Sequence, residues 1–215
     1  MNSKDLKLIY IWDAYCGWCY GFSTGLNEFH KMHPELPITV LSGGLFVGDR
    51  KRPISDYPHI PGANQRIEQL SGVKFGDAYQ ELLEKGNFVL DSEAAAKGFA
   101  ALEHFSSEKA YELAAAMQKA FYSEGKSLSE EATFREIADA FGLDADEVIK
   151  RFKSDEAGRD SLKAFHTVHN LGVNSYPTLL LQKGEKLIKI GGGAMSAEKL
   201  EENFRTALQN DSLES

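Results

Sequence analysis

The sequence Tyr15-Cys16-Gly17-Trp18-Cys19-Tyr20 holds the only two cysteines of the 215-residue chain. The segment Leu6–Asp13 before it, with its apolar run Leu8–Trp12, is typical of a buried strand, and the residues from Cys16 to about His33 predict a helix. A CxxC pair at a strand–helix junction indicates a redox dithiol, because the free N–H groups of the first helical turn favour a thiolate. We expect Cys16 to attack a disulfide and Cys19 to resolve the mixed disulfide.

Metal and cofactor sites have weaker support in the sequence. Two cysteines supply at most half of a tetrahedral zinc site, and no Cys or His pair at ligand spacing follows soon after them. His30 with His33, and His166 with His169, share a helical face, but no third ligand is apparent. The glycine run at 191–193 lacks the Lys-Ser/Thr of a phosphate loop. We therefore predict no metal and no cofactor, and an accidental cysteine pair stays open.

Composition limits the partners and the compartment. The net charge of -8 argues against nucleic acid or an anionic membrane as the main partner, since clustered Lys and Arg bind both. The basic run Arg50-Lys51-Arg52 is the one exception, and we expect it to be a solvated loop. The apolar run Leu8–Trp12 is too short for a signal peptide or a membrane span. We expect a cytoplasmic protein, in which a CxxC pair rests mostly reduced.

The order of predicted elements divides the chain into an α/β part and a helical part. Strand, helix and strand are complete by Ser42, and the Gly- and Pro-rich stretch Gly48–Gly62 predicts a break. Helices then dominate, with 63–155 read as an inserted helical subdomain. The segments 1–50 and 156–215 form the other domain, and 210–215 is a frayed tail. The predicted elements are helices at 75–85, 92–105, 107–123, 129–141, 145–153, 158–171 and 196–209, and an antiparallel strand pair at 178–182 and 186–190.

Three features together resemble one family. They are CxxC after the first strand, a helical block after the second, and a lone Pro177 before the third. The chain resembles the DsbA family, which has a thioredoxin-like fold with a helical subdomain inserted between its β-α-β and β-β-α halves. The segments 13–22, 120–125 and 171–178 are similar to its signal-less FrnE-like cytoplasmic branch. The resemblance implies a thiol–disulfide oxidoreductase or isomerase with a redox-active centre at Cys16 and Cys19.

The same resemblance implies a second wall for the active site. Pro177 stands where the fold has a cis-proline, which would bring the backbone of Tyr176 opposite Cys16. In the family this backbone pairs with an extended substrate segment, so Tyr176 and Pro177 become substrate-binding candidates. Trp18 is a further one, because it stands beside the reactive sulfur, although it could equally pack against the helical insertion. A glycine of the run 191–193 is expected to relieve a close approach near this site.

One position departs from the thioredoxin pattern. These proteins often carry a buried acid six residues before the first cysteine, where this chain has Tyr10. Asp13 is nearer, and it serves either proton transfer or the turn into the helix. The uncharged Gly17-Trp18 spacer leaves the thiolate dependent on helix-terminal amides, so we expect a milder oxidant than DsbA-type proteins with a histidine there.

Three functions follow from these residues. The first is a cytoplasmic oxidoreductase or isomerase that exchanges protein thiols and disulfides, with a cellular dithiol or glutathione as reductant. The second is a glutathione-dependent transferase or isomerase of the kappa type, a branch that usually has a serine where Cys16 stands. The third is a non-catalytic adaptor whose cysteine pair senses redox state or forms part of an intermolecular metal site. The sequence gives no substrate, reductant or oligomeric state.

Overall fold

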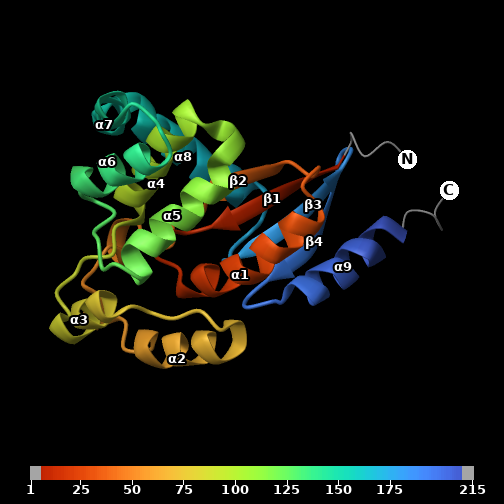
Figure 1. Ribbon diagram of the computed structural model, residues 1–215, viewed down its shortest axis with the longest axis horizontal. Coiled ribbons are helices and arrows are strands. Elements are labelled where there is room, and N and C mark those ends of the chain that lie inside the picture. Colours follow the sequence, from red (N-terminus) through yellow and green to blue (C-terminus); the bar gives the residue numbers. More distant parts are fainter. Residues whose placement is uncertain (1–5, 210–215) are drawn as a thin grey trace.

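The computed structural model describes residues 6–209, and the predicted frayed tail lies outside the described residues. Its sheet has four strands in the order β2-β1-β3-β4 (Figure 1). β1 pairs in parallel with β2 and antiparallel with β3, and β4 is antiparallel to β3, as the short Lys183-Gly184-Glu185 connection predicts. The strands are β1 (Leu6–Trp12), β2 (Ile38–Ser42), β3 (Thr178–Lys183) and β4 (Lys186–Gly192).

Helices cover both faces of this sheet. α1 (Gly17–Met32) and α9 (Ala197–Gln209) pack on one face, and α8 (Asp155–Asn170) packs on the other (Figure 1). Tyr10 of β1 contacts Phe22 of α1, with ring centroids 5.9 Å apart, while Ile9 clusters with Val168 of α8. From Leu8 to Trp12, β1 is therefore buried on both sides, which explains why this part of its sequence is a continuous apolar run.

The helical insertion lies between β2 and α8. Its predicted helices are present, with boundaries that shift by a few residues, and one more helix, α2, precedes them. The observed elements are η2 (Gly48–Arg50), η3 (Ile54–Asp56), α2 (Ile60–Ser71), α3 (Asp77–Lys85), α4 (Ser92–Phe105), η4 (Ser107–Lys109), α5 (Ala110–Tyr122), α6 (Glu131–Ala140) and α7 (Ala145–Lys153).

The predicted break over Gly48–Gly62 extends too far, because its last residues belong to a helix. Two short 3₁₀ turns occupy its middle, and α2 begins at Ile60, inside the stretch. Pro61 lies in the first turn of α2, where the missing N–H removes no helical hydrogen bond. α2 docks closely on α1, because a Cβ at Gly21 would lie 2.6 Å from the side chain of Ile67. Proline therefore starts a helix here instead of excluding one.

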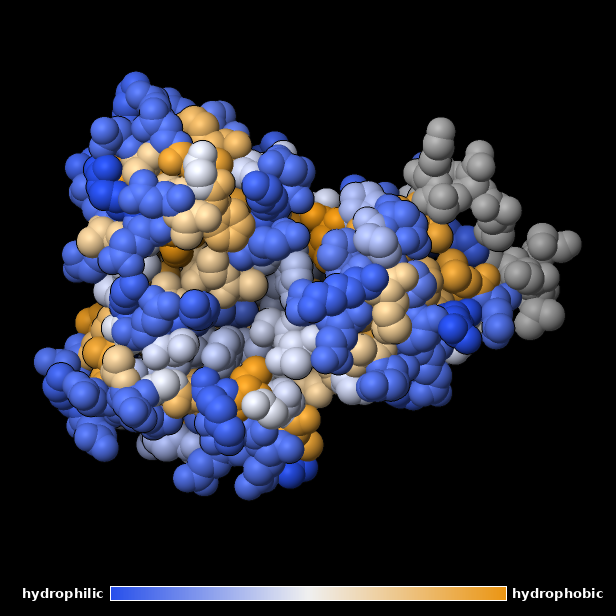
Figure 2. Space-filling model, viewed as in Figure 1, coloured by the Kyte–Doolittle hydropathy of each residue, from blue (hydrophilic) through white to orange (hydrophobic). Residues whose placement is uncertain are grey.

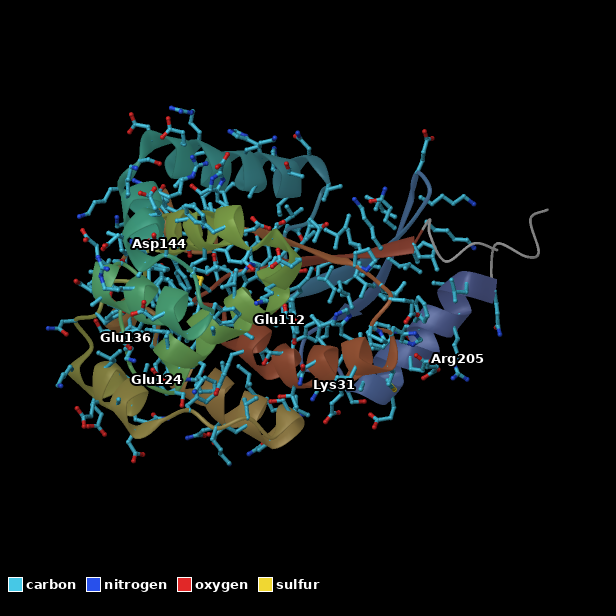
Figure 3. All side chains as sticks on the ribbon, turned by 45° about the horizontal axis from the view of Figure 1, so that its top comes forward. Lys31, Glu112, Glu124, Glu136, Asp144 and Arg205 are labelled. Carbon is cyan, nitrogen blue, oxygen red and sulfur yellow. The ribbon has the colours of Figure 1, made fainter. Side chains whose placement is uncertain are left out.

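Capping residues mark three of the helix ends. Asp144 accepts hydrogen bonds from the amides of Asp146 and Glu147, at 3.0 and 3.1 Å, and so begins α7 (Figure 3). Ser196 Oγ accepts from the amide of Lys199 at 3.4 Å at the start of α9. Gly86 ends α3 in the left-handed conformation, with φ of 69°.

The visible surface is mostly hydrophilic, with one broad, weakly hydrophobic area over the helical insertion and smaller hydrophobic patches elsewhere (Figure 2). The most exposed large apolar side chains are 40–52 % accessible and stand on different elements; they are Met32, Leu70, Val89, Phe105, Leu162 and Leu187. Lys31 and Arg205 extend from the neighbouring helices α1 and α9 (Figure 3). Within residues 6–209, no helix combines the length and apolar character that crossing a membrane requires.

Candidate active site

The two cysteines differ in their surroundings and in their solvent exposure. Cys16 is the N-cap of α1, and its Sγ accepts a hydrogen bond from the amide of Cys19 at 3.4 Å. Cys16 is 5 % exposed, whereas Cys19 is 0 % exposed, and both are free thiols. The helix N-terminus thus directs an amide at the sulfur that is closer to solvent.

Burial controls the protonation of Cys19. It raises the pKa of the Cys19 thiol well above its ordinary value, and the hydrogen bond and charge of Cys16 raise that pKa further. The amide of Asp13 opposes this rise in pKa. Cys19 therefore stays a thiol at neutral pH until the chemistry at Cys16 changes its surroundings.

The loop before β3 supplies the opposite wall. The Tyr176–Pro177 bond is cis, as predicted, and the Cys16 thiol donates to the carbonyl oxygen of Tyr176 at 3.5 Å. The Tyr176 hydroxyl donates to the carbonyl oxygen of Gly43 at 2.6 Å, which ties this loop to the end of β2. A Cβ at Gly192 would lie 2.9 Å from the carbonyl oxygen of Pro177, so the predicted close approach is present.

Trp18 forms a ridge between two cavities. On one side it lines a groove of about 640 Å³ together with Ser175, Tyr176, Pro177 and the β4–α9 turn. On the other side it lines a cavity of about 100 Å³ beside Cys16 and α2. The half-buried indole therefore lies between the groove beside Pro177 and the cavity beside the insertion, and a substrate-binding role for Trp18 stays a prediction.

The small cavity contains residues that the sequence analysis did not select. Asn64 of α2 donates to the hydroxyl of Tyr79 at 3.1 Å, and burial raises the pKa of Tyr79 to about 12. Both side chains line the cavity beside Cys16. The seven-residue spacing of Ile60 and Ile67, with Pro61 at the helix start, is the signal that could have revealed α2 and with it Asn64.

Asp13 is fully engaged in the structure around the dithiol. Its carboxylate accepts from the amide of Tyr15 at 3.0 Å, the amide of Leu45 at 2.8 Å and the hydroxyl of Ser92 at 2.9 Å. Burial raises the pKa of Asp13, and these three donors oppose the rise. Asp13 thus joins the turn before α1 to the loop after β2 and to the start of α4.

Tyr10 occupies the position of the missing acid as a neutral phenol. It is 1 % exposed, and its hydroxyl donates to the carbonyl oxygen of Cys19 at 3.5 Å. Burial raises the pKa of Tyr10 well above its ordinary value, and the charges of Cys19 and Tyr111 raise that pKa further. The position therefore carries no negative charge behind Cys19 at physiological pH.

The discounted polar motifs have structural partners. Arg50, Lys51 and Arg52 are exposed, as expected of a solvated segment. Lys51 also forms an ion pair with Asp91 at 2.5 Å, and Arg50 donates to the carbonyl oxygen of Gly44 at 3.2 Å. His33 hydrogen-bonds to Glu201 at 2.6 Å. His166 and His169 are exposed on α8, in keeping with surface histidines.

A family model described as the DSBA-like thioredoxin domain matches residues 8–205. The chain belongs to this family. Family membership indicates thiol–disulfide oxidoreductase or isomerase chemistry, and it agrees with a thioredoxin-like fold that carries a helical insertion. No curated protein matches the chain.

Solved structures share the fold of this DSBA-like protein. A protein disulfide isomerase candidate from Nitrosomonas europaea has a TM-score of 0.82 and 24 % identity, covering 96 % of this chain and 98 % of its own. The cytosolic disulfide reductase DsbM from Pseudomonas aeruginosa has a TM-score of 0.78 and 23 % identity, covering 94 % and 98 %. A second DsbM structure contains GSH. A 2-hydroxychromene-2-carboxylate isomerase has a TM-score of 0.68 and 17 % identity, covering 97 % and 99 %.

Proposed function

We propose that this protein is a cytoplasmic thiol–disulfide oxidoreductase or isomerase that acts on protein disulfides through Cys16 and Cys19. The observation that carries the proposal is the asymmetry of the pair. The Cys16 sulfur accepts an amide hydrogen bond and lies at the end of a cavity, whereas Cys19 is inaccessible and its pKa is raised. A dithiol enzyme needs this division between an attacking and a resolving sulfur.

The reaction transfers two electrons to the substrate. The Cys16 thiolate attacks one sulfur of a substrate disulfide, forms a mixed disulfide and releases the other sulfur as a thiolate that takes up a proton. Cys19 then loses its proton and attacks the Cys16 sulfur, which releases the second substrate thiol. The product is a Cys16–Cys19 disulfide and a reduced substrate. Glutathione or a cellular dithiol then returns two electrons to the pair.

The groove beside Pro177 fits an extended substrate segment. Among the described residues, none accepts a hydrogen bond from the amide of Tyr176, so that amide is free to pair with a substrate backbone. Trp18 offers an aromatic surface next to the sulfur, and the groove continues along the β4–α9 turn. A substrate segment here would place its disulfide over Cys16, opposite the carbonyl of Tyr176.

A reductase assay with matched cysteine variants tests the proposal. Purified protein is given a disulfide-bonded protein and reduced glutathione, and thiol release is followed for the wild type, Cys16→Ser and Cys19→Ser. We expect the rate to fall by more than about a hundredfold in Cys16→Ser, because a hydroxyl is a weak nucleophile. Reactivation of a scrambled protein separates isomerase from reductase activity.

The variants also separate the competing functions. A glutathione-dependent enzyme that uses one sulfur would keep its turnover in Cys19→Ser, while a dithiol reductase would lose it. A wild-type protein that neither reduces nor isomerises protein disulfides, with Cys16→Ser indistinguishable from it, would contradict the proposal and favour an adaptor.

A further inference from the structure

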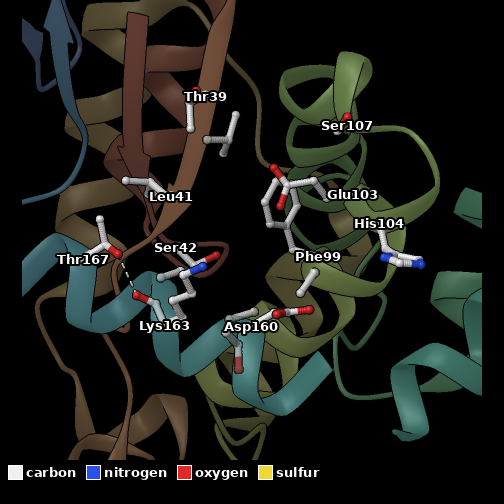
Figure 4. A pocket seen from close by; sticks show the side chains of 15 residues that line it. Thr39, Leu41, Ser42, Phe99, Glu103, His104, Ser107, Asp160, Lys163 and Thr167 are labelled. Atoms are coloured by element: carbon white, nitrogen blue, oxygen red, sulfur yellow. Dashed lines mark hydrogen bonds between the residues drawn. The ribbon is translucent and has the colours of Figure 1, made fainter. Parts of the chain in front are cut away.

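A second groove lies between the edge of the sheet and two helices. It has a volume of about 390 Å³, and its walls are β2, α4 and α8 (Figure 4). Thr39, Val40, Leu41 and Ser42 line it in succession, and none of the residues assigned to the dithiol site does. Its volume is within the range of about 300–1,000 Å³ that is common for binding pockets.

The groove opens on backbone groups that pair with nothing. β2 is an edge strand, so only one of its two sides pairs with β1. The Pro37 carbonyl accepts from the Leu8 amide, and the Gly43 amide donates to the Trp12 carbonyl. The backbone groups of the odd-numbered residues therefore point toward β1. Val40 and Ser42 are even-numbered, and their N–H and C=O groups therefore point to the other side, away from β1. Across residues 6–209, these groups have no hydrogen-bond partner. An edge of this kind is a template for another strand.

The same groove holds an unpaired carboxyl group. Glu103 extends from α4 toward the space that Thr39 and Leu41 border (Figure 4). Lys163 and His104 line the same groove, but neither forms an ion pair with Glu103, and within the described part of the chain the Glu103 side chain has no hydrogen bond. Burial raises the pKa of Glu103 to about 7, and the charge of Asp160 contributes. Asp160 itself is paired with Arg151 at 2.6 Å. A half-buried carboxylate without a partner favours a cation in its vicinity.

From this juxtaposition we propose that the groove binds an extended protein segment, which adds to the free edge of β2 as a further strand and places a Lys or Arg beside Glu103. Hydrogen bonds to Val40 and Ser42 hold the backbone of the segment, and its basic side chain fixes the register. The net charge of -8 on the chain also favours a basic partner.

A second copy of this chain fits the groove less well. Pairing β2 with β2 of a second copy would bring together two Ile38-Thr39-Val40-Leu41-Ser42 segments, which contain no Lys or Arg. Such a pairing would leave Glu103 without a cation. The other edge strand, β4, carries Lys186 and Lys189, but a β4-to-β2 contact joins two different surfaces and would extend from copy to copy instead of closing a dimer. The proposal therefore commits to a basic segment of another protein.

Fluorescence anisotropy with a defined peptide tests this proposal independently of the redox function. The probe is a labelled, cysteine-free peptide, acetyl-Thr-Val-Thr-Lys-Thr-Val-Thr-amide, which cannot exchange disulfides. One comparison peptide has Glu in place of Lys, and another carries N-methyl groups on alternate amides. The protein variants are Glu103→Gln and, as a matched loss of charge, Glu84→Gln on the exposed face of α3.

The lysine peptide is expected to bind the wild type and Glu84→Gln equally. Its affinity should fall about fivefold or more for Glu103→Gln, for the Glu peptide and for the N-methylated peptide, since each change removes a charge pair or the backbone bonds. Hydrogen exchange should slow at the amides of Val40 and Ser42 when the peptide is bound. Absent binding at millimolar peptide, equal binding of the Glu peptide, or a β2–β2 dimer that the peptide fails to displace would each overturn the proposal.

Discussion

The buried Asp13 and the half-buried Glu103 show how the dithiol corner, which comprises Cys16, Cys19 and the residues around Asp13, differs from the groove at the edge of β2. Burial raises the pKa of both Asp13 and Glu103. Asp13 accepts three hydrogen bonds that join three segments around the cysteines, whereas Glu103 accepts none from the described residues. The contacts around the cysteines are therefore complete before a substrate arrives, whereas the groove holds a carboxyl group that pairs with none of the described residues, although Lys163 lines the same groove.

Removing the acceptor in the dithiol corner should have the largest effect. Asp13→Ala leaves the amides of Tyr15 and Leu45 and the hydroxyl of Ser92 without their acceptor in a buried site. We expect the free energy of unfolding to fall by about 3 kcal/mol or more. Urea unfolding measures the change, and Asp146→Ala, at an exposed ion pair, should cost less than about 1 kcal/mol. Equal losses in the two variants would refute the structural role of Asp13.

Neutralising Glu103 should raise the free energy of unfolding, whereas removing Asp13 lowers it. The pKa of Glu103 is raised from 4.5 to about 7, so the folded state favours the protonated acid. The stability that this group contributes is complete below about pH 4.5 and is lost as pH rises through about 7. Glu103→Gln should therefore be more stable than the wild type at about pH 8, by on the order of 2 kcal/mol.

The difference between Glu103→Gln and the wild type should disappear below about pH 4.5, where the Glu103 carboxyl is protonated in both the folded and the unfolded protein. Thermal unfolding across the pH range measures it. Glu84→Gln serves as the control, with an expected change within about 0.5 kcal/mol at every pH. A constant difference between Glu103→Gln and wild type at all pH values would show that packing, and not titration, separates them.

Trp18 tests whether the dithiol corner also binds substrate. Trp18→Ala removes the ridge between the two cavities and should raise KM for a protein disulfide about fivefold, or about 1 kcal/mol, with a smaller change in kcat. Steady-state kinetics is measured with a protein disulfide and with a small disulfide. A loss of substrate contact at Trp18 affects the protein substrate more, whereas a folding defect affects both substrates equally. A change confined to kcat would argue against a binding surface.

Tyr10→Phe should have the smallest effect. The hydroxyl makes one long hydrogen bond, at 3.5 Å, to the carbonyl oxygen of Cys19, and the ring packing is retained. We expect a stability change within about 1 kcal/mol and a reductase rate within about twofold of the wild type. A large loss of rate at unchanged stability would instead assign Tyr10 a part in proton transfer at Cys19.

The sequence predicted the parts of the fold that depend on local pattern. The buried run of β1, the start of α1 at the cysteines and the hairpin at Gly184 each follow from periodicity or turn chemistry, and the structure confirms them. The cis bond before Pro177 and its place opposite Cys16 needed the family resemblance, because 160 residues separate the two.

Long-range contacts are what the sequence could not predict. Nothing local in Asp13 shows that Ser92, 79 residues away, donates to it. α2 was missed because prolines at 58 and 61 weigh against a helix unless the helix starts there. Glu103 likewise reads as an ordinary helical residue in the sequence, because only the fold shows that it lines a groove with the edge of β2.

A trapping experiment tests the central claim, that Cys16 attacks and Cys19 resolves. Cys19→Ala and Cys16→Ala are each incubated with oxidised glutathione, quenched with acid and mapped by mass spectrometry. We expect a stable glutathione adduct on Cys16 in Cys19→Ala, almost none on Cys19 in Cys16→Ala, and an internal disulfide in the wild type. An adduct that forms on Cys19 as fast as on Cys16 would show that Cys16 is not the preferred attacking sulfur.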